Sequence, residues 1–249
     1  MMIMPAYAIA FIQPTNPAFK EYPPLFPPTL KPYDGKTIFK CMVSEAATNG
    51  GPEFKEEGAN DFKIAIGVEF PTLEKAMAWK NCAEYQSIIG IRLENSTGPL
   101  IVCDGTGKSV ESGASAYCLA FLKATGPKFT EFPPKVQATL DPYGGEYLVR
   151  CMLDKPAGDG GPAHAERTTA EDYTVAVLLG FPTVEKLHGW YDSSEYYYIS
   201  LQWLFYLRNS LFLTNTCSCC LQRNTKILSI FVLTTPLGLL LDARLSLRI

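Results

Sequence analysis

The sequence predicts an α+β protein made of two similar βαββαβ units whose sheets pack on each other within one chain. Three observations carry this prediction. Most of the chain is duplicated, strand-like and helix-like segments alternate within each copy, and the strands are apolar on both faces. With 47% hydrophobic and 19% charged residues among 249, the composition is that of a folded globular protein.

The duplication is visible as an internal repeat with an offset of 110 residues. Between residues 7–42 and 117–152, 16 of 36 positions are identical and occur in the same order. After a one-residue insertion the match resumes with a second Phe-Pro-Thr motif, and Trp79 then meets Trp190. A match of this density indicates a tandem duplication, which has to be recognised before the fold is assigned.

The repeat also sets the predicted domain boundaries. We expect a first unit at 5–105, a Gly- and Ser-rich linker at 106–114, and a second unit at 115–215. The second unit loses its similarity to the first after residue 196. The remaining segment, 216–249, is a tail for which the sequence predicts no domain.

The first half of each unit is predicted as strand, helix, strand. In the first copy, residues 7–12 form a short apolar run that ends at Gln-Pro, as strands often do. The prolines at 23–24 suit the first turn of a helix, which we expect to end near Leu30. A Tyr-Asp-Gly turn then leads into a second strand at 36–43, and a polar, Gly-rich loop follows at 44–60.

The second half is again strand, helix, strand. Residues 61–70 alternate large apolar side chains with small or polar ones, which is the period of a strand. Thr72 is a helix cap, and Glu74 in the first turn favours the helix dipole, so we expect a helix that includes Trp79. Residues 100–103 form the last strand. The order βαββαβ is that of a ferredoxin-like unit.

The first strand is apolar on both faces, because Ile9 and Phe11 alternate with Ala8 and Ala10. A single ferredoxin-like unit covers one face of its sheet with helices and leaves the other face open to water. An apolar second face needs a second cover, and the duplicate supplies it. We therefore expect an intrachain pseudo-dimeric α+β barrel that functions as a monomer.

Charge and composition exclude several function classes. The net charge is −3 and the pI is about 5.5, which argues against a nucleic-acid partner. The chain has two histidines, which are too few for a multi-histidine metal site. Cys217, Cys219 and Cys220 form a cluster, but the second ligand pair that a zinc site normally needs does not follow it. We therefore expect no metal and no organic cofactor. The five other cysteines lie singly in mostly apolar runs, and the N-terminus lacks a basic signal region, so we expect reduced thiols in a cytoplasmic protein.

A family resemblance supports the barrel. The pattern Tyr-Gly-Gly-x-Tyr-Leu-Val-Arg at 143–150, then a strand that ends in Phe-Pro-Thr, then Trp190 and a Ser-Glu-Tyr segment, resembles domain-of-unknown-function family 1330. The first copy carries the corresponding marks, so the resemblance covers residues 5–104 and 115–196. That family belongs to the dimeric α+β barrel superfamily, so the resemblance implies a barrel with a small cavity and no particular reaction.

Two residues are candidates for catalysis. Glu69 lies on the small face of its strand, where a carboxylate beside a cavity would suit a general base. Arg92 would bind an anionic group. The alternatives are a solvated strand-end Glu and a structural ion pair. The second unit has Gly180 and Trp203 at these positions, so we expect only the first unit to keep such a site.

Six further residues are predicted to bind a ligand: Tyr33, Lys40, Trp79, Tyr143, Arg150 and Trp190. For the two basic residues the alternative is surface solvation or a structural ion pair. For the aromatic residues it is packing, since the tryptophans have the helical spacing of core residues.

Two functions stay open from the sequence. The first is a soluble protein that binds a small organic molecule in the barrel cavity, between the sheets, with or without cofactor-independent catalysis. The second is a non-catalytic structural or protein-interaction module.

The basic, leucine-rich end of the chain has three interpretations. It is an altered terminus that arises by splicing, intron read-through or a frameshift, a membrane anchor, or a helical extension. Residues 211–215 align with the last strand of the first unit and are a possible replacement for it.

Overall fold

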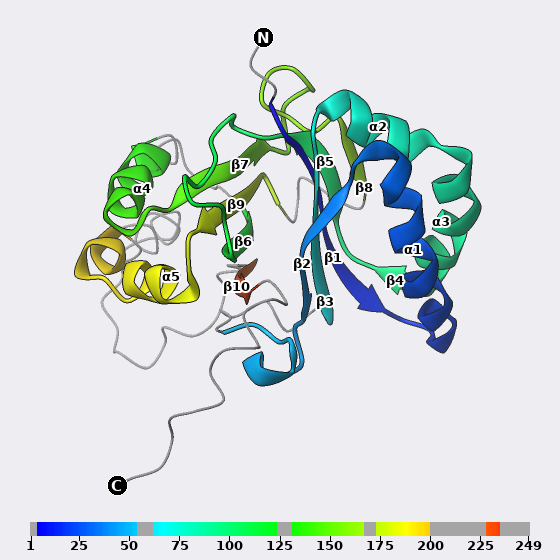
Figure 1. Cartoon of the computed structure of the whole chain (residues 1–249), viewed down its shortest axis with the longest axis horizontal. Helices are drawn as coiled ribbons and strands as arrows, with labels where there is room; N and C mark the ends of the chain where they lie inside the picture. Colours follow the sequence, from blue (N-terminus) through cyan, green and yellow to red (C-terminus); the bar gives the residue numbers. More distant parts are fainter. Residues whose placement is uncertain (1–3, 54–61, 124–130, 167–172, 200–227, 235–249) are drawn as a thin grey trace, which may run out of the picture.

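The computed structural model describes residues 4–53, 62–123, 131–166, 173–199 and 228–234, the last of these as backbone. Trp203, the expected strand at 211–215 and the cysteines at 217–220 lie outside the described residues. The described part contains two antiparallel sheets that face each other, with helices on the outer side of each sheet (Figure 1).

The first sheet has the strand order β2-β3-β1-β5, which is the order expected of a ferredoxin-like unit. Its strands are β1 (Ala6–Pro14), β2 (Lys36–Met42), β3 (Ile64–Phe70) and β5 (Leu100–Asp104), with a short β4 (Ser96–Thr97) paired to the end of β1. Its outer face is covered by α1 (Tyr22–Leu30), α2 (Leu73–Asn81) and α3 (Ala83–Asn95). Short 3-10 turns lie at Pro17–Glu21, Lys31–Tyr33 and Ala47–Asn49.

The second sheet repeats this order as β10-β6-β9-β7. Its strands are β6 (Ala116–Leu122), β7 (Glu146–Met152), β9 (Val175–Phe181) and β10 (Leu228–Thr234). Its described helices are α4 (Phe132–Leu140) and α5 (Val184–Tyr191), with a 3-10 turn at Asp141–Tyr143. The expected α+β class with ferredoxin-like βαββαβ units is therefore confirmed.

Two strands depart from the sequence expectation. The fourth strand of the second sheet, β10, comes from the tail and pairs antiparallel with β6. The strand β8 (His164–Glu166) belongs to the loop between β7 and β9, yet it pairs with β5 of the first sheet. Neither segment has a counterpart strand in the repeat, which is why the sequence comparison did not predict them.

The second helical segment of each unit begins as expected. The Thr72 hydroxyl accepts a hydrogen bond from the Lys75 amide (3.2 Å), and the Thr183 hydroxyl accepts one from the Lys186 amide (3.3 Å). In the first unit the helix ends at Cys82, whose extended backbone separates α2 from α3. The sequence predicts one helix here, and α3, which supplies Arg92, was not predicted from it.

The space between the sheets is filled by the side chains of both units. Phe11 and Phe121 pack with ring centroids 5.3 Å apart, and Phe39 and Tyr117 pack at 5.5 Å. The buried cluster continues through strands of both sheets. Both faces of β1 are thus covered, as its sequence required. Among the described residues, these core side chains occupy the space between the sheets where a cavity was expected.

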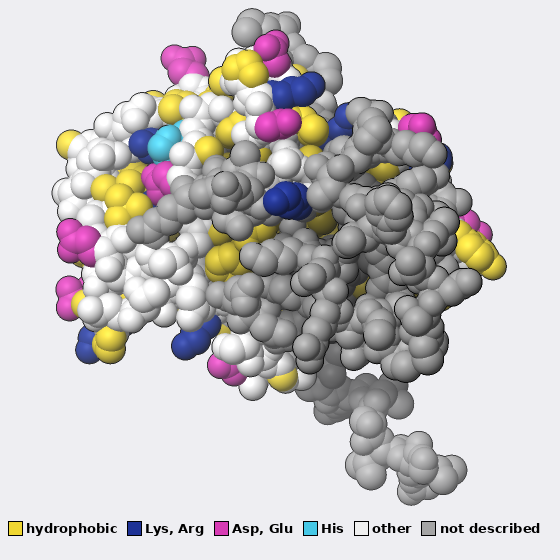
Figure 2. Space-filling model, turned by 180° about the vertical axis from the view of Figure 1, so that it is seen from behind, with side chains coloured by type: hydrophobic (Ala, Val, Ile, Leu, Met, Phe, Trp, Pro, Cys, Tyr) yellow, Lys and Arg dark blue, Asp and Glu magenta, His cyan; other side chains and the backbone are white. Residues whose placement is uncertain are grey.

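On the face shown in Figure 2, the acidic and basic side chains of the described residues are interspersed rather than gathered by sign. No described helix is long and apolar enough to cross a membrane.

Candidate functional site

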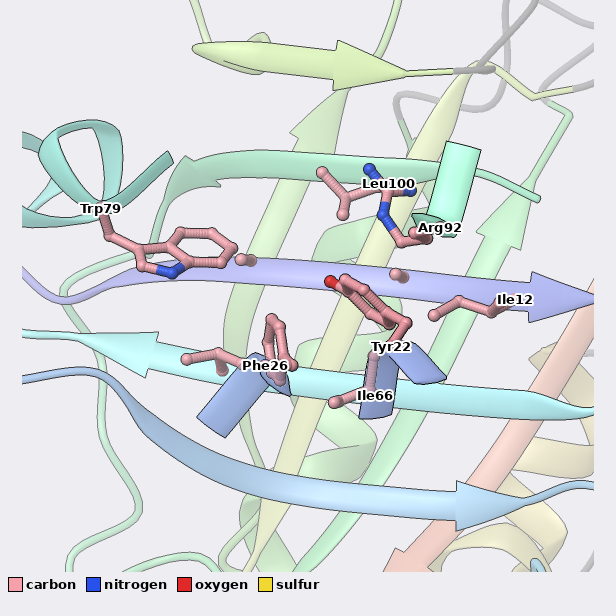
Figure 3. A pocket seen from close by; sticks show the side chains of 10 residues that line it. Ile12, Tyr22, Phe26, Ile66, Trp79, Arg92 and Leu100 are labelled. Carbon is pink, nitrogen blue, oxygen red and sulfur yellow. The ribbon is translucent and has the colours of Figure 1, made fainter. Parts of the chain in front are cut away.

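A pocket lies between the outer face of the first sheet and its three helices (Figure 3). Its volume is about 30 Å³. It is lined by Ala8, Ala10, Ile12, Tyr22, Phe26, Ile66, Val68, Trp79, Arg92 and Leu100. The space is enough for one or two waters or a few heavy atoms of a larger molecule.

The pocket exists because β1 presents small side chains on the face that the helices cover. Ala8 and Ala10 lie there, whereas the larger Ile9 and Phe11 face the other sheet. Trp79 forms one wall and is held firmly, since its indole N–H donates to the Thr29 hydroxyl at 3.0 Å. The wall is therefore a fixed surface rather than a movable side chain.

Arg92 forms the polar end of the pocket, away from Trp79 in Figure 3. It is 2% exposed and comes from the last turns of α3. One terminal nitrogen forms an ion pair with Glu166, which β8 carries from the second unit. His164 Nε2 lies 2.9 Å from the other oxygen of Glu166. The Nε of Arg92 is buried without a hydrogen-bond partner among the described protein atoms.

These contacts fix the charge states at the polar end. Burial alone would raise the pKa of Glu166, but the hydrogen bond with His164 and the charge of Arg92 lower it to about 2. Burial opposes the charged form of Arg92, yet Tyr85 and Glu166 raise its pKa overall. Burial raises the pKa of both Tyr22 and Tyr85, so these hydroxyls stay neutral. The polar end is an ion pair next to uncharged donors.

Glu69 lies on the opposite face of the sheet. It accepts a hydrogen bond from the Tyr7 hydroxyl at 3.0 Å, and burial together with this carboxylate raises the pKa of Tyr7. Burial and the charge of Glu69 also raise the pKa of Tyr117 to about 12. The alternation in β3 sends Val68 to the pocket and Glu69 to the other sheet. The structure therefore does not bring Glu69 and Arg92 into one site.

Of the six residues predicted to bind a ligand, Trp79 lines the pocket. Lys40 and Arg150 are exposed on the edge strands β2 and β7. Tyr33 is half-buried, and its interaction with the Cys82 thiol raises its pKa. These three residues are not among the pocket-lining side chains.

The other two aromatic residues belong to the second unit and also lie outside the pocket. Tyr143 is half-buried and packs against Gly189. Trp190 repeats the environment of Trp79, with its N–H donated to the Thr139 hydroxyl at 3.0 Å.

Sequence reasoning missed three residues that shape the polar end. Tyr22 lies in a proline-rich helix, and from the sequence it is indistinguishable from an ordinary packing residue. Glu166 and His164 sit in a loop of the other unit, and their contact with Arg92 depends on how the two units pack. The sequence feature that could have indicated this site is that Arg92 is present in one copy of the repeat only. Among the described residues, no group of three or more His, Cys, Asp or Glu side chains is placed to hold a metal ion.

The family model described as domain of unknown function DUF1330 matches residues 5–106 and 115–201. The chain belongs to this family. The two matched segments correspond to the two copies of the repeat, so a tandem duplication of the DUF1330 domain is confirmed. No curated protein sequence matches the chain.

Several solved structures are similar to this chain at low sequence identity. A candidate monooxygenase from Fusobacterium nucleatum is 6% identical, with a TM-score of 0.46 and 94% of each chain covered. A candidate monooxygenase from Lactobacillus acidophilus is 8% identical, with a TM-score of 0.42, 80% of this chain and 87% of that chain. A mutant chlorite dismutase from Candidatus Nitrospira defluvii is 10% identical, with a TM-score of 0.38, 78% of this chain and 85% of that chain.

Proposed function

We propose that this DUF1330 protein binds a small, mainly apolar organic molecule in the pocket of its first unit. The observation that carries the proposal is the pocket itself. It has apolar walls, a rigid tryptophan on one side and a buried arginine at one end. Concave apolar sites with a few fixed polar groups are typical of small-molecule binding.

Binding without proton transfer is the form of this function that the geometry favours. Glu69, the expected general base, faces the other sheet, and Glu166 is held as the counter-ion of Arg92. Neither carboxylate is free to take a proton from a molecule in the pocket. The five other residues predicted to bind a ligand remain proposed ligand contacts elsewhere on the protein: Tyr33, Lys40, Tyr143, Arg150 and Trp190.

The repeat offers a matched pair of variants to test the pocket. Ala10→Val adds two methyl groups to the pocket wall, and Ala120→Val makes the same change at the equivalent buried position of the second unit. We expect small apolar fragments to raise the thermal midpoint of the wild type and of Ala120→Val, but not of Ala10→Val. Equal responses of the two variants would place binding elsewhere.

A second candidate function is a non-catalytic interaction module. The observation in its favour is the cluster of described core side chains that packs between the sheets, where a barrel ligand would otherwise lie. If no fragment from a chemically broad set shifts the midpoint of the wild type, this second function becomes the preferred one.

We also infer that the chain functions as a monomer. The second unit covers the inner face of the first sheet, which a separate subunit would otherwise cover. Light scattering on the full chain should give a mass near 27.5 kDa. A mass of twice this value would show that another surface is also used.

A further inference from the structure

Three of the ten pocket-lining side chains carry polar atoms: Tyr22, Trp79 and Arg92. The indole N–H of Trp79 already donates to Thr29. The Tyr22 hydroxyl is hydrogen-bonded with Tyr85. Arg92 is therefore the lining side chain with a polar atom available to a bound molecule, and Figure 3 shows it at the end of the pocket away from Trp79.

The Nε–H of Arg92 is a donor without an acceptor among the described protein atoms. The residue is 2% exposed, and its terminal nitrogen is paired with Glu166. Buried donors in folded proteins almost always have a partner. A water molecule can fill that place in the free protein, and an oxygen atom of a bound molecule can replace the water.

The positive charge of Arg92 is already balanced. Glu166 reaches it from the second unit and is itself fixed by His164. A second carboxylate next to Arg92 would lie close to Glu166 in surroundings of low polarity, where like charges repel strongly. It would also lose its hydration without gaining an unpaired counter-ion. An uncharged acceptor avoids both penalties.

We propose that the pocket selects an uncharged, mainly apolar molecule with one carbonyl or ether oxygen, which accepts the Nε–H of Arg92. This inference rests on the proposed function and specifies its ligand class. The small volume limits the buried part of the molecule to a few heavy atoms around that oxygen. Glu166 is then a specificity residue that the second unit supplies to the first.

The second unit is a natural control within the chain. Phe132 stands at the position of Tyr22, and Val136 stands at the position of Phe26. The sequence places Trp203 at the position of Arg92. Trp190 and Tyr196 keep the aromatic contact that Trp79 and Tyr85 make, but the Tyr22 hydroxyl has no counterpart in Phe132. The selectivity is therefore a property of the first unit.

Three probes with five heavy atoms each test the proposal on the full chain: 2-butanone, propionate and 2-methylbutane. The NMR signal of the Trp79 indole N–H reports entry into the pocket, and the signal of the Arg92 Nε–H reports the hydrogen bond. We expect 2-butanone to bind about tenfold more tightly than propionate and 2-methylbutane. The Arg92 signal should shift with 2-butanone alone.

Glu166→Gln tests the origin of the selectivity. The variant leaves Arg92 with an unbalanced charge, so propionate should become the tightest of the three probes. Glu94→Gln, an exposed change on the same helix as Arg92, should keep the order found for the wild type. If the three probes keep the wild-type order of affinities in Glu166→Gln, the role given to Glu166 is wrong.

The outcomes separate this inference from the proposed function. If propionate binds the wild type as well as 2-butanone does, the selection against anions is wrong. If 2-butanone and 2-methylbutane bind equally and the Arg92 signal does not move, the hydrogen bond is wrong while the pocket function stands. If no probe shifts the Trp79 signal, the proposed function fails, and the inference fails with it.

Discussion

Residues that the repeat duplicates do the same structural work in both units. Trp79 and Trp190 each donate to a threonine hydroxyl at 3.0 Å, and each packs at a tilt against a tyrosine, with ring centroids 4.3 and 4.1 Å apart. Gly35 and Gly145 are kept because a Cβ atom would come within 2.7 and 2.6 Å of a phenylalanine ring. Residues that both copies share therefore maintain the scaffold, and residues that differ between the copies indicate where the polar end of the site lies.

Thr29→Val should lower the free energy of unfolding by about 1–3 kcal/mol, because it leaves the buried N–H of Trp79 without an acceptor. Thr139→Val should have a similar effect through Trp190. Urea denaturation measures both changes. In a Trp79→Phe background, Thr29→Val should cost much less, since the donor is gone. A Thr29→Val protein as stable as the wild type would show that the hydrogen bond contributes little.

The Glu166 carboxylate should give the protein a component of acid sensitivity. Its pKa is about 2 in the folded protein and about 4.3 in an unfolded chain, so its contribution is full above the unfolded value. That contribution is lost as the pH falls through the folded value. Glu166→Gln should lack this component between pH 6 and pH 2 and should be less stable at pH 6 by about 3 kcal/mol.

Chemical denaturation at several pH values compares Glu166→Gln with the wild type. Other carboxylates titrate in the same range, so the difference between the two proteins is the informative quantity. Glu94→Gln is the control for the loss of one exposed acid. Parallel pH curves for the wild type and Glu166→Gln would contradict the ion pair with Arg92.

At the level of single elements, the strands β8 and β10 connect distant parts of the chain. β8 extends the first sheet beyond β5 and carries Glu166 to Arg92. β10 completes the second sheet beside β6. Each strand covers an edge that would otherwise leave backbone N–H and C=O groups unpaired. Both strands are therefore integral parts of the two sheets.

Removal of β10 should expose the edge of β6. A chain that ends after residue 227 should show amide exchange in β6 that is faster by at least about tenfold. A chain that ends after Thr234 keeps the strand and is the matched control. Hydrogen exchange followed by mass spectrometry measures both. Equal protection of β6 in the two chains would show that β10 contributes little to the sheet.

At the scale of the whole molecule, the two units share one core. Phe11 and Phe62 of the first unit stack at 5.3 Å, and Phe11 also packs on Phe121 of the second unit. The buried cluster between the sheets draws on both copies, whereas each helical side has its own cluster. The units should therefore unfold together and not one after the other.

Phe121→Ala should lower the free energy of unfolding by about 3–5 kcal/mol, because it leaves a cavity between the sheets. Amides of β1 and β6 should lose protection together. Leu187→Ala, which opens a cavity on the helical side of the second sheet, is the comparison and should affect the amides around α5 most. Loss of protection confined to the second unit in Phe121→Ala would contradict a shared core.

The sequence by itself determined the duplication, the α+β class, the βαββ order of each unit and the need for a second cover on the sheet. These features depend on the period of apolar residues, on caps such as Thr72 and on turns such as Tyr-Asp-Gly at 33–35, all of which are local in the chain. Trp79 was singled out from the sequence as a candidate ligand contact, and in the structure it lines the pocket.

The position of the pocket and the residues at its polar end depend on contacts that form only when the chain folds. Arg92 was recognisable, but its partner Glu166 comes from a loop of the other unit, and Glu69 proved to face the opposite side of the sheet. The strand β10 came from a segment outside the repeat. Such contacts join residues far apart in sequence, and they are set by how sheets and strands pack, which no local pattern of residues encodes.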